Sequence, residues 1–442
     1  MTDRPEAGPT LSRRRFLRTA AAATGVAVVG GVGGLVGFEL AGTRGGPSPT
    51  GPEGSVGPLA SAAAIGEPTG GPSIVPFRDV HQAGIATPAQ DRLAFATFDV
   101  TGTDRTALVG LLRQWTAAAE RMTRGEPVGT PEGGPLAPPE DTGEAVGLRP
   151  GRLTVTIGFG PNLFDARFGL ADRRPAALAE IPRFPGDFLE PERSGGDIAI
   201  QACADDPQLA FHAVRNLARL GRGIVVMRWF QLGFGRTAST SSSQVTPRNL
   251  QGFKDGTNNI VAEDVDLMRD HVWVGDETDQ PWMRDGSYVV IRRIRMLVEA
   301  WDRTSLGEQE RVIGRVKSSG SPLTGTAEHD PVDLAVLGSD GTPVVALDAH
   351  IRLAAPSTAA GERILRRGYS YTDGIHLQTG LLDAGLFFIA YQRDPRTGFV
   401  PIQRRLAGLD SLNEYIRHTG SALFACPPGL GSGAWWGQTL FD

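Results

Sequence analysis

One short segment of the chain combines a carboxylate with the glycines of a tight turn. Residues 252–259 read GFKDGTNN, so Asp255 stands between a lysine and a glycine and is followed by Thr257 and two asparagines. Asp-Gly and asparagine-rich segments are typical of tight turns, so a purely structural turn is one interpretation. The other is a loop that presents the Asp255 carboxylate for proton transfer, because an ionised carboxylate can act first as a base and then as an acid.

A histidine supplies the second candidate for chemistry. His350 lies in LDAHIRLAAP, an apolar stretch with an arginine two residues later and a proline six residues later. A buried, hydrogen-bonded core histidine is one interpretation of this context, and a functional histidine is the other. We expect ordinary structural or exposed positions for His81, His212, His329 and His418, which stand in a predicted helix or in polar segments.

The cysteines and the missing metal motifs narrow the choice of cofactor. Cys203 and Cys426 both lie in apolar segments, which favours two buried thiols over a disulfide. The absence of CxxCH excludes covalent c-type haem attachment, and the absence of CxxC and HExxH leaves zinc without an obvious site.

The first half of the chain predicts alternating strands and helices. Period-two patterns indicate strands, whereas apolar residues at helical spacing, such as those from Leu108 to Met122, indicate helices. The resulting order is βαββαβ, which is typical of a ferredoxin-like unit with two helices on one face of an antiparallel sheet. The predicted segments are Leu93–Val100, Leu108–Met122, Leu153–Phe159, Ile198–Ala204, Asp206–Leu220 and Ile224–Phe234.

The second half repeats this order less regularly. We expect a strand, a helix, a long irregular insert at about 317–380, a strand, a helix and a strand. An insert of that length in a compact domain is usually functional. The predicted fold class is therefore α+β, with two ferredoxin-like domains built on antiparallel sheets. The predicted segments of this half are Tyr288–Leu297, Val298–Val316, Gly385–Tyr391, Val400–Leu406 and Ala422–Ala425.

The N-terminus predicts export. Arg13 and Arg14 belong to SRRRFL, a twin-arginine motif, and a mildly apolar run follows within residues 1–42. A Tat signal is favoured, with an uncleaved membrane anchor as the alternative, because glycine makes the run weakly hydrophobic. The Tat pathway carries folded proteins, often with a cofactor already inserted. Residues 43–90 read as a Pro/Gly-rich spacer, so we expect the fold to begin near Leu93.

Length and charge set the domain number and one class of partner. A chain of 442 residues exceeds the usual size of a single hydrophobic core, so two domains are expected, at 91–240 and 241–442. The formal net charge of -5 argues against nucleic acid as a partner.

Several segments, taken in order, resemble one enzyme family. The chain is similar to the dye-decolourising peroxidases, and especially to their Tat-exported branch, which includes deferrochelatase/peroxidase proteins. The resemblance covers roughly residues 75–440. It rests on GFKDGTNN, DAHIRLAAP, ILRRGYSY and GLFFIAYQRD, together with VTIGFGPNLF, QACADDPQLAFHAVRNL, SYVVIRRIRMLVEAWDR and EQERVIGRVK.

The resemblance implies an activity, a cofactor and partners. It implies an exported peroxidase with one haem b per chain in the C-terminal domain, acting outside the cytoplasmic membrane on hydrogen peroxide and phenolic or dye-like donors. The Tat export machinery and a homo-oligomer are further implied partners. The same branch also implies an alternative, a haem-handling protein that releases iron from haem or delivers haem, with incidental peroxidase activity.

The resemblance also implies roles for single residues. The distal aspartate of the family corresponds to Asp255, the distal arginine to Arg366, and the proximal haem ligand to His350. The acidic partner of that histidine corresponds to Asp410, with Glu414 as the competing candidate. In physical terms, Asp255 would move a proton between the peroxide oxygens, and Arg366 would stabilise negative charge on the departing oxygen. Further haem contacts correspond to Gly256, Thr257, Asn258, Ala355, Pro356 and Ser357.

Two positions depart from the pattern of the family. Asn259 stands where relatives often have alanine, and Ala355 stands where they often have asparagine. Neither departure removes a group with a catalytic role.

Overall fold

The structure is a computed structural model that describes residues 74–130 and 134–442. The twin-arginine motif, the apolar run and most of the predicted spacer lie outside these ranges. Within them, no helix is both long and apolar enough to cross a membrane.

The first half forms the predicted βαββαβ unit. All six predicted elements are present, and the two helices begin at Asp104 and Asp206, whose side chains accept hydrogen bonds from backbone N–H groups of the first turn. The strands are antiparallel in the order β2-β3-β1-β4. The elements are β1 (Arg92–Val100), α2 (Arg105–Thr123), β2 (Thr154–Phe159), β3 (Ile198–Ala204), α3 (Pro207–Leu220) and β4 (Val225–Arg236).

The second half has an equivalent strand order, β9-β5-β8-β7. Its strands and main helix are β5 (Ser287–Met296), β6 (Leu365–Arg366), β7 (Tyr369–Ile375), β8 (Leu382–Gln392), α8 (Phe399–Leu409) and β9 (Ile416–Cys426). The shorter helices are α4 (Val265–His271), α5 (Val298–Trp301), α6 (Leu306–Ile313), α7 (His350–Ala354) and α9 (Gln438–Phe441).

Two predictions for this half were wrong. The helix expected over Val298–Val316 is divided into α5 and α6, because Ser305 has extended backbone angles and its side chain caps α6 at the N–H of Glu308. The insert at 317–380 was expected to be irregular, but it contains β7. This strand pairs with β8 and has buried tyrosines at its start and exposed residues at its end.

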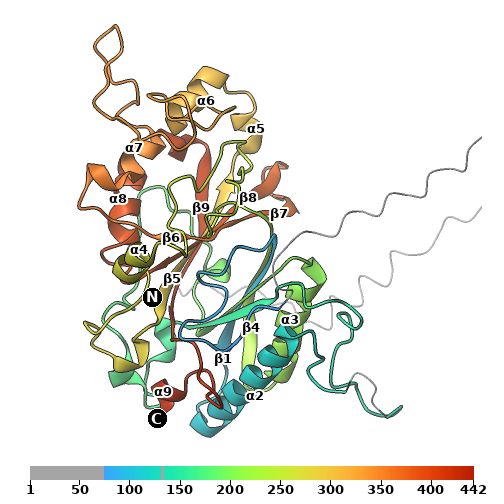
Figure 1. Cartoon of the computed structure of the whole chain (residues 1–442). Coiled ribbons are helices and arrows are strands. Elements are labelled where there is room, and N and C mark those ends of the chain that lie inside the picture. Colours follow the sequence, from blue (N-terminus) through green and yellow to red (C-terminus); the bar gives the residue numbers. More distant parts are fainter. Residues whose placement is uncertain (1–73, 131–133) are drawn as a thin grey trace, which may run out of the picture. The chain divides into compact units, whose positions relative to one another are not determined.

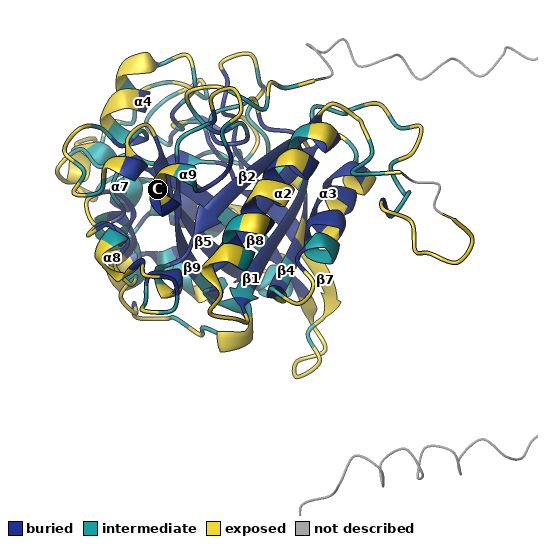
Figure 2. Ribbon diagram, turned by 90° about the horizontal axis from the view of Figure 1, so that it is seen from below, coloured by how far each residue is buried: buried dark blue, intermediate teal, exposed yellow. Residues whose placement is uncertain are grey.

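The two halves join into one continuous sheet. β4 pairs with β7, β2 pairs with β9, and β5 pairs with both β9 and β8, so the strand order closes on itself. Figure 1 shows α2 and α3 of the first half beside β1 and β4. One apolar cluster lies between α2, α3 and the outer face of the first four strands. Figure 2 shows these helices with their exposed sides turned away from the sheet. A second cluster draws residues such as Phe95, Tyr371 and Phe387 from strands of both halves and lies on the inner side of the closed sheet.

The fold begins earlier than the sequence predicted. Ile85 is fully buried, and the buried Gln82 side chain donates hydrogen bonds to the carbonyls of Ile157 (3.1 Å) and Pro427 (2.8 Å). The segment before Leu93 is therefore part of the packed structure. Its irregular backbone explains why no periodic pattern indicated this packing. The two cysteines are free and buried, as expected.

Candidate active site

A cavity lies on the outer face of β5 and β8, on the side away from the inner apolar cluster. β5 contributes Arg292, Ile294 and Met296, and β8 contributes Leu386 and Phe388. Successive residues of a strand point to opposite faces, so these alternate positions share one wall. The remaining walls come from the loop at 249–260, from α7, from residues 362–366, from α8 and from residues 410–418.

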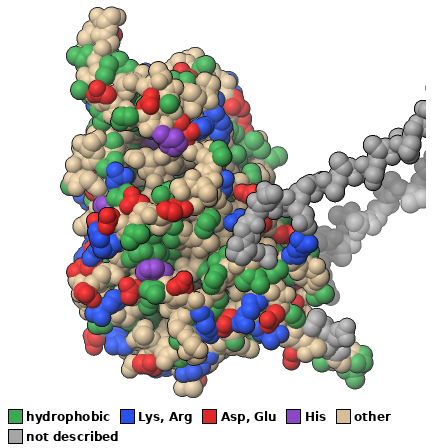
Figure 3. Space-filling model, viewed as in Figure 1, with side chains coloured by type: hydrophobic (Ala, Val, Ile, Leu, Met, Phe, Trp, Pro, Cys, Tyr) green, Lys and Arg blue, Asp and Glu red, His purple; other side chains and the backbone are tan. Residues whose placement is uncertain are grey.

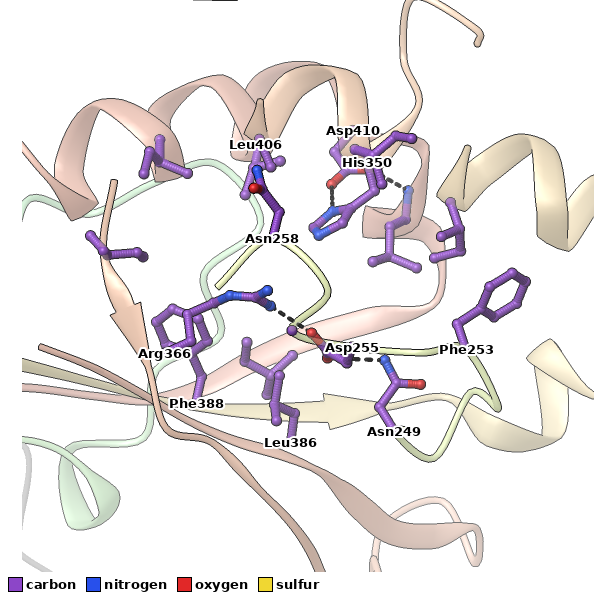
Figure 4. Close-up of a pocket in the computed structure, with 18 of the residues that line it drawn as sticks. Asn249, Phe253, Asp255, Asn258, His350, Arg366, Leu386, Phe388, Leu406 and Asp410 are labelled. Carbon is purple, nitrogen blue, oxygen red and sulfur yellow. Dashed lines mark hydrogen bonds and ion pairs between the residues drawn. The ribbon is translucent and has the colours of Figure 1, made fainter. Parts of the chain in front are cut away.

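His350 and Asp410 form one side of the cavity. His350 is the first residue of α7, and Asp410 follows α8, where its Oδ1 accepts a hydrogen bond from the N–H of Leu412. The Asp410 Oδ2 lies 2.6 Å from the His350 Nδ1, whereas Glu414 is exposed. Among the described residues, Nε2 of His350 has no hydrogen-bond partner, and Figure 4 shows the ring turned toward the cavity.

The Asp410 carboxylate controls the protonation of this histidine. Burial opposes the charged imidazolium, but the charge of Asp410 and its hydrogen bond outweigh burial, so the pKa of His350 is raised above its ordinary value. The same hydrogen bond fixes the ring orientation and leaves Nε2 as the nitrogen available to a ligand.

Asp255 and Arg366 form the opposite side of the cavity. The Arg366 Nη1 lies 2.5 Å from the Asp255 Oδ1, and the Asn249 Nδ2 donates to the Asp255 Oδ2 at 3.2 Å (Figure 4). Both side chains of the ion pair are only partly exposed. A cation and a carboxylate thus face the histidine pair across one space.

The turn in GFKDGTNN is what presents the carboxylate. Gly256 has φ +90°, and a Cβ there would lie 2.9 Å from the Cα of Ala238, so the position requires glycine. The loop is anchored on both sides of Asp255, because Lys254 forms an ion pair with Glu328 and Thr257 donates to the same carboxylate at 3.2 Å. The two interpretations of this segment are therefore compatible.

Asn259 ties the two parts of the ion pair together, a function that the sequence did not reveal. Its Nδ2 donates to the carbonyl of Arg366 at 2.8 Å, and its Oδ1 accepts from the N–H of Arg366 at 2.8 Å. The loop that carries Asp255 is thereby held against the strand that carries Arg366. The signal in the sequence was the departure from alanine at this position.

The other expected contacts are divided. The cavity is lined by Gly256, Thr257, Asn258, Ala355 and Pro356. Ser357 is exposed and lies outside the lining. It belongs to the short turn of 3-10 helix at Pro356–Thr358.

A buried arginine marks the wall of the cavity formed by β5. Arg292 is 1 % exposed, forms an ion pair with Asp187, and donates from Nε to the His418 Nδ1 at 3.3 Å. Burial and the nearby Arg292 charge lower the pKa of His418 to about 3, so this ring is neutral and can accept that bond. The sequence reasoning missed both residues, although a run of arginines in an apolar strand was a visible signal.

The donor set of the cavity fits a haem. The Arg292 Nη1 is buried and has no hydrogen-bond partner within the described residues, which suits a carboxylate such as a porphyrin propionate. Apolar side chains of β5, β8 and α8, including Ile294, Leu386 and Leu406, provide walls for a flat macrocycle. The Nε2 of His350, which faces the cavity, is the kind of donor that binds haem iron.

Comparisons with known proteins agree with this geometry. Residues 82–235 match the family model described as Dyp-type peroxidase, N-terminal, and residues 246–431 match the model described as Dyp-type peroxidase, C-terminal. The chain is 41 % identical over 361 residues to proteins named deferrochelatase from Escherichia coli strains 536 and K12, covering 80 % of this chain and 84 % of each relative.

Solved structures give the same result. A DyP-type peroxidase from Streptomyces coelicolor and an oxyferrous complex of DtpA from Streptomyces lividans each have a TM-score of 0.77 and 41 % identity, covering 84 % of this chain and 97 % of theirs. A DyP-type peroxidase from Cellulomonas bogoriensis has a TM-score of 0.74 and 41 % identity, covering 84 % of this chain and 100 % of its own.

Proposed function

Because the chain belongs to the Dyp-type peroxidase family, we propose that its four facing residues His350, Asp410, Asp255 and Arg366 carry peroxide reduction at a haem b and that its donors are phenolic or dye-like. Membership makes the chain a haem-dependent peroxidase. The observation that supports the residue roles is the placement of a histidine–carboxylate pair and an arginine–carboxylate pair across one cavity.

The histidine pair would hold the cofactor. His350 would bind the iron through Nε2 while Asp410 accepts the Nδ1–H, which keeps the ring in one tautomer and increases its basicity. When bound, the haem supplies the redox centre through which electrons from the donor reduce peroxide. The Arg292 guanidinium would pair with a propionate at the wall formed by β5.

The second pair would act on the peroxide. Asp255 takes the proton from one peroxide oxygen and returns it to the other, which lets that oxygen leave as water. The guanidinium of Arg366 would stabilise the negative charge that builds on the departing oxygen. The direct contact between the two keeps both groups at the same place before peroxide arrives.

Turnover by the haem-loaded protein tests this function. Protein purified with adequate haem supply should show a Soret band and should oxidise a phenolic dye only when hydrogen peroxide is added. A haem-loaded preparation that consumes no peroxide with any phenolic donor would contradict it.

The names of the relatives support a second candidate function. Proteins named deferrochelatase match 80 % of the chain, so iron release from haem, or haem delivery, is the alternative. Incubation with haem should then yield free porphyrin, detected by its fluorescence, faster than peroxide-dependent dye oxidation proceeds. Dye oxidation without porphyrin formation favours the peroxidase.

The architecture of the chain is part of the proposal. Two ferredoxin-like domains, at 91–240 and 241–442, with the haem in the second, are supported by the equivalent strand orders β2-β3-β1-β4 and β9-β5-β8-β7. Expression of each segment alone tests the boundaries, because an independent domain should give a cooperative unfolding transition.

Export by the Tat pathway is proposed from the sequence. Replacing Arg13 and Arg14 with lysine should retain the haem-loaded protein in the cytoplasm, since the motif is read by a receptor. The unchanged chain should reach the periplasm, the cell wall or the medium. Equal amounts of both proteins outside the cytoplasmic membrane would contradict this route.

A further inference from the structure

A second cavity, of about 460 Å³, lies on the inner side of the two strands that form a wall of the active site. In β5 the lining alternates, because Arg292 faces the active site whereas Ile291 and Arg293 line the second cavity. In β8, Leu386 and Phe388 face the active site, and the residue between them, Phe387, lines the second cavity. One layer of backbone therefore separates the two cavities.

Aromatic side chains in fixed positions line this cavity. The Trp229 indole stacks on Phe95 with ring centroids 5.4 Å apart and lies edge-on to Phe387 at 6.1 Å. Its Nε1 donates to the carbonyl of Gly195 at 2.9 Å, so the polar end of the indole is already satisfied. Rigid aromatic walls that need no hydrogen bond suit an aromatic ligand.

Apart from Glu192 at the exposed rim, the charged groups that line the cavity compensate one another. Arg293 is buried, and its Nη2 donates to Asp373 (2.8 Å) and Asp383 (2.9 Å), while its Nε donates to Gln231 (3.0 Å). At the rim, Arg193 also pairs with Asp373 at 3.1 Å. An unpaired charge on a ligand would have to displace one of these bonds, so the cavity favours a neutral molecule.

The cavity has an exposed rim and a buried floor. β4 pairs with β7 only through Phe234 and Arg236, which leaves the preceding part of β4 without a partner strand on that side. The rim residues Leu232 and Thr372 are exposed, whereas Phe387 on the floor is 1 % exposed. Trp229 itself is 9 % exposed, so part of its side chain is open to solvent. A volume of about 460 Å³ is within the usual range for small-molecule pockets.

We propose that this cavity binds a small neutral phenol and serves as a donor site separate from the haem cavity. The proposal rests on the peroxidase function given above. Two phenol molecules bind one after the other, and each loses one electron and one proton. Hydrogen peroxide takes up the two electrons and two protons, so that H2O2 + 2 ArOH gives 2 H2O + 2 ArO•. The electrons cross from the Trp229 and Phe387 side of β8 to the side lined by Leu386 and Phe388.

Titration calorimetry of the haem-loaded protein with 4-methoxyphenol tests the site. Trp229→Leu should weaken one class of sites by about 10-fold, since it removes an aromatic contact and its buried area. Trp229→Phe keeps a ring face and should bind within about 3-fold of the unchanged protein. The matched control is Trp435→Leu, which removes another buried indole that lines neither cavity and should leave binding unchanged. Equal binding by all four proteins overturns the proposal.

Two further measurements keep the proposal testable if Trp229→Leu does not fold. A crystal structure of the unchanged protein with 4-methoxyphenol should place the ring against Trp229, and a ring seen only in the haem cavity overturns the site. In steady state at saturating peroxide, Trp229→Phe should raise KM for this phenol by at most about 3-fold. With the unchanged protein, 4-methoxybenzoate, which carries a charge, should compete at least about 10-fold more weakly than a neutral analogue. Calorimetry needs no turnover, so lost binding and lost peroxidase activity are separate results.

Discussion

Each half of the molecule contains a histidine beside an aspartate, but the surroundings of the two histidines differ. In the first half, His212 on α3 lies with Nε2 3.5 Å from Asp141 and Nδ1 3.5 Å from Glu144, and its side chain is 4 % exposed. In the second half, the His350 Nδ1 lies 2.6 Å from Asp410, and the side chain is 33 % exposed. Protein groups therefore face both nitrogens of His212, whereas one nitrogen of His350 faces a cavity.

The difference shows that a histidine–carboxylate pair is not by itself a site. Both oxygens of Asp141 also accept backbone N–H groups, from Val128 and from Gly143, each at 2.7 Å. That pair holds the loop before β2 onto α3. The wider surface gives no further guide, because acidic and basic side chains are interspersed on the face seen in Figure 3. What distinguishes His350 is the free nitrogen and the second charged pair opposite it.

The largest expected effect comes from replacing each of the two histidines. His350→Ala should lose most bound haem, because it removes the ring whose Nε2 faces the cavity and would bind the iron. His212→Ala is the matched control and should lose stability while it retains haem. Haem content per chain, measured from the Soret band after purification with added haem, decides between them. Equal haem content in both variants would contradict the assignment of the ligand.

The next effect concerns the pair across the cavity. Asp255→Asn keeps the shape but removes the proton acceptor, and Arg366→Leu keeps the acceptor but removes the positive charge. Each should slow the reaction with peroxide by about 10² or more while haem content stays the same. Stopped-flow mixing of haem-loaded protein with peroxide measures the rate. If Asp255→Asn reacts at the unchanged rate and Arg366→Leu does not, the arginine acts without the carboxylate.

Most of the strands were predictable because their burial follows a regular pattern. β3 and β5 are wholly buried, and the two long helices of the first half have clear caps and apolar faces. β7 was missed, because its buried half comprises only three residues and its second half is exposed. The break between α5 and α6 was also missed, since helical spacing continues across the capping residue Ser305.

The site was predictable only in part. Motifs indicated Asp255, His350 and Arg366, since each lies in a segment shared with a known family. Arg292 and Asn259 act through partners more than 100 residues away in the chain, and no local pattern encodes such contacts. Their roles depend on which face of a strand or loop meets the cavity, which only the fold determines.

A third buried histidine extends the comparison to acid stability. His418 is 6 % exposed beside Arg292, and its pKa is lowered to about 3, so the folded protein resists protonation there. The unfolded chain takes up this proton at about pH 6.5, so stability falls as the pH drops from 6.5 toward 3. His418→Gln keeps a hydrogen-bond acceptor for Arg292 but has no imidazole to protonate. Between pH 7 and pH 5, its free energy of unfolding should therefore fall by about 2 kcal/mol less than that of the unchanged protein.

Denaturant titration at both pH values measures this difference. His329→Gln is the control, because His329 is largely exposed and should lose stability with acid as the unchanged protein does. The same loss of stability for His418→Gln and the unchanged protein would mean that His418 does not resist protonation in the fold.

The smallest expected effect concerns the alignment of the pair that faces His350. Asn259 binds the backbone of Arg366 at both its N–H and its carbonyl, so Asn259→Ala should let the arginine shift away from Asp255 without removing either group. We expect a loss in the rate of peroxide reduction on the order of 10-fold, below the roughly 10²-fold that a 1 Å misplacement can cost. Both groups of the pair are still present in this variant, so the loss should appear in the stopped-flow rate while haem content stays unchanged. Asn259→Asp should not restore the rate, since a carboxylate cannot donate to the Arg366 carbonyl. A full rate in Asn259→Ala would mean that the strand alone positions Arg366.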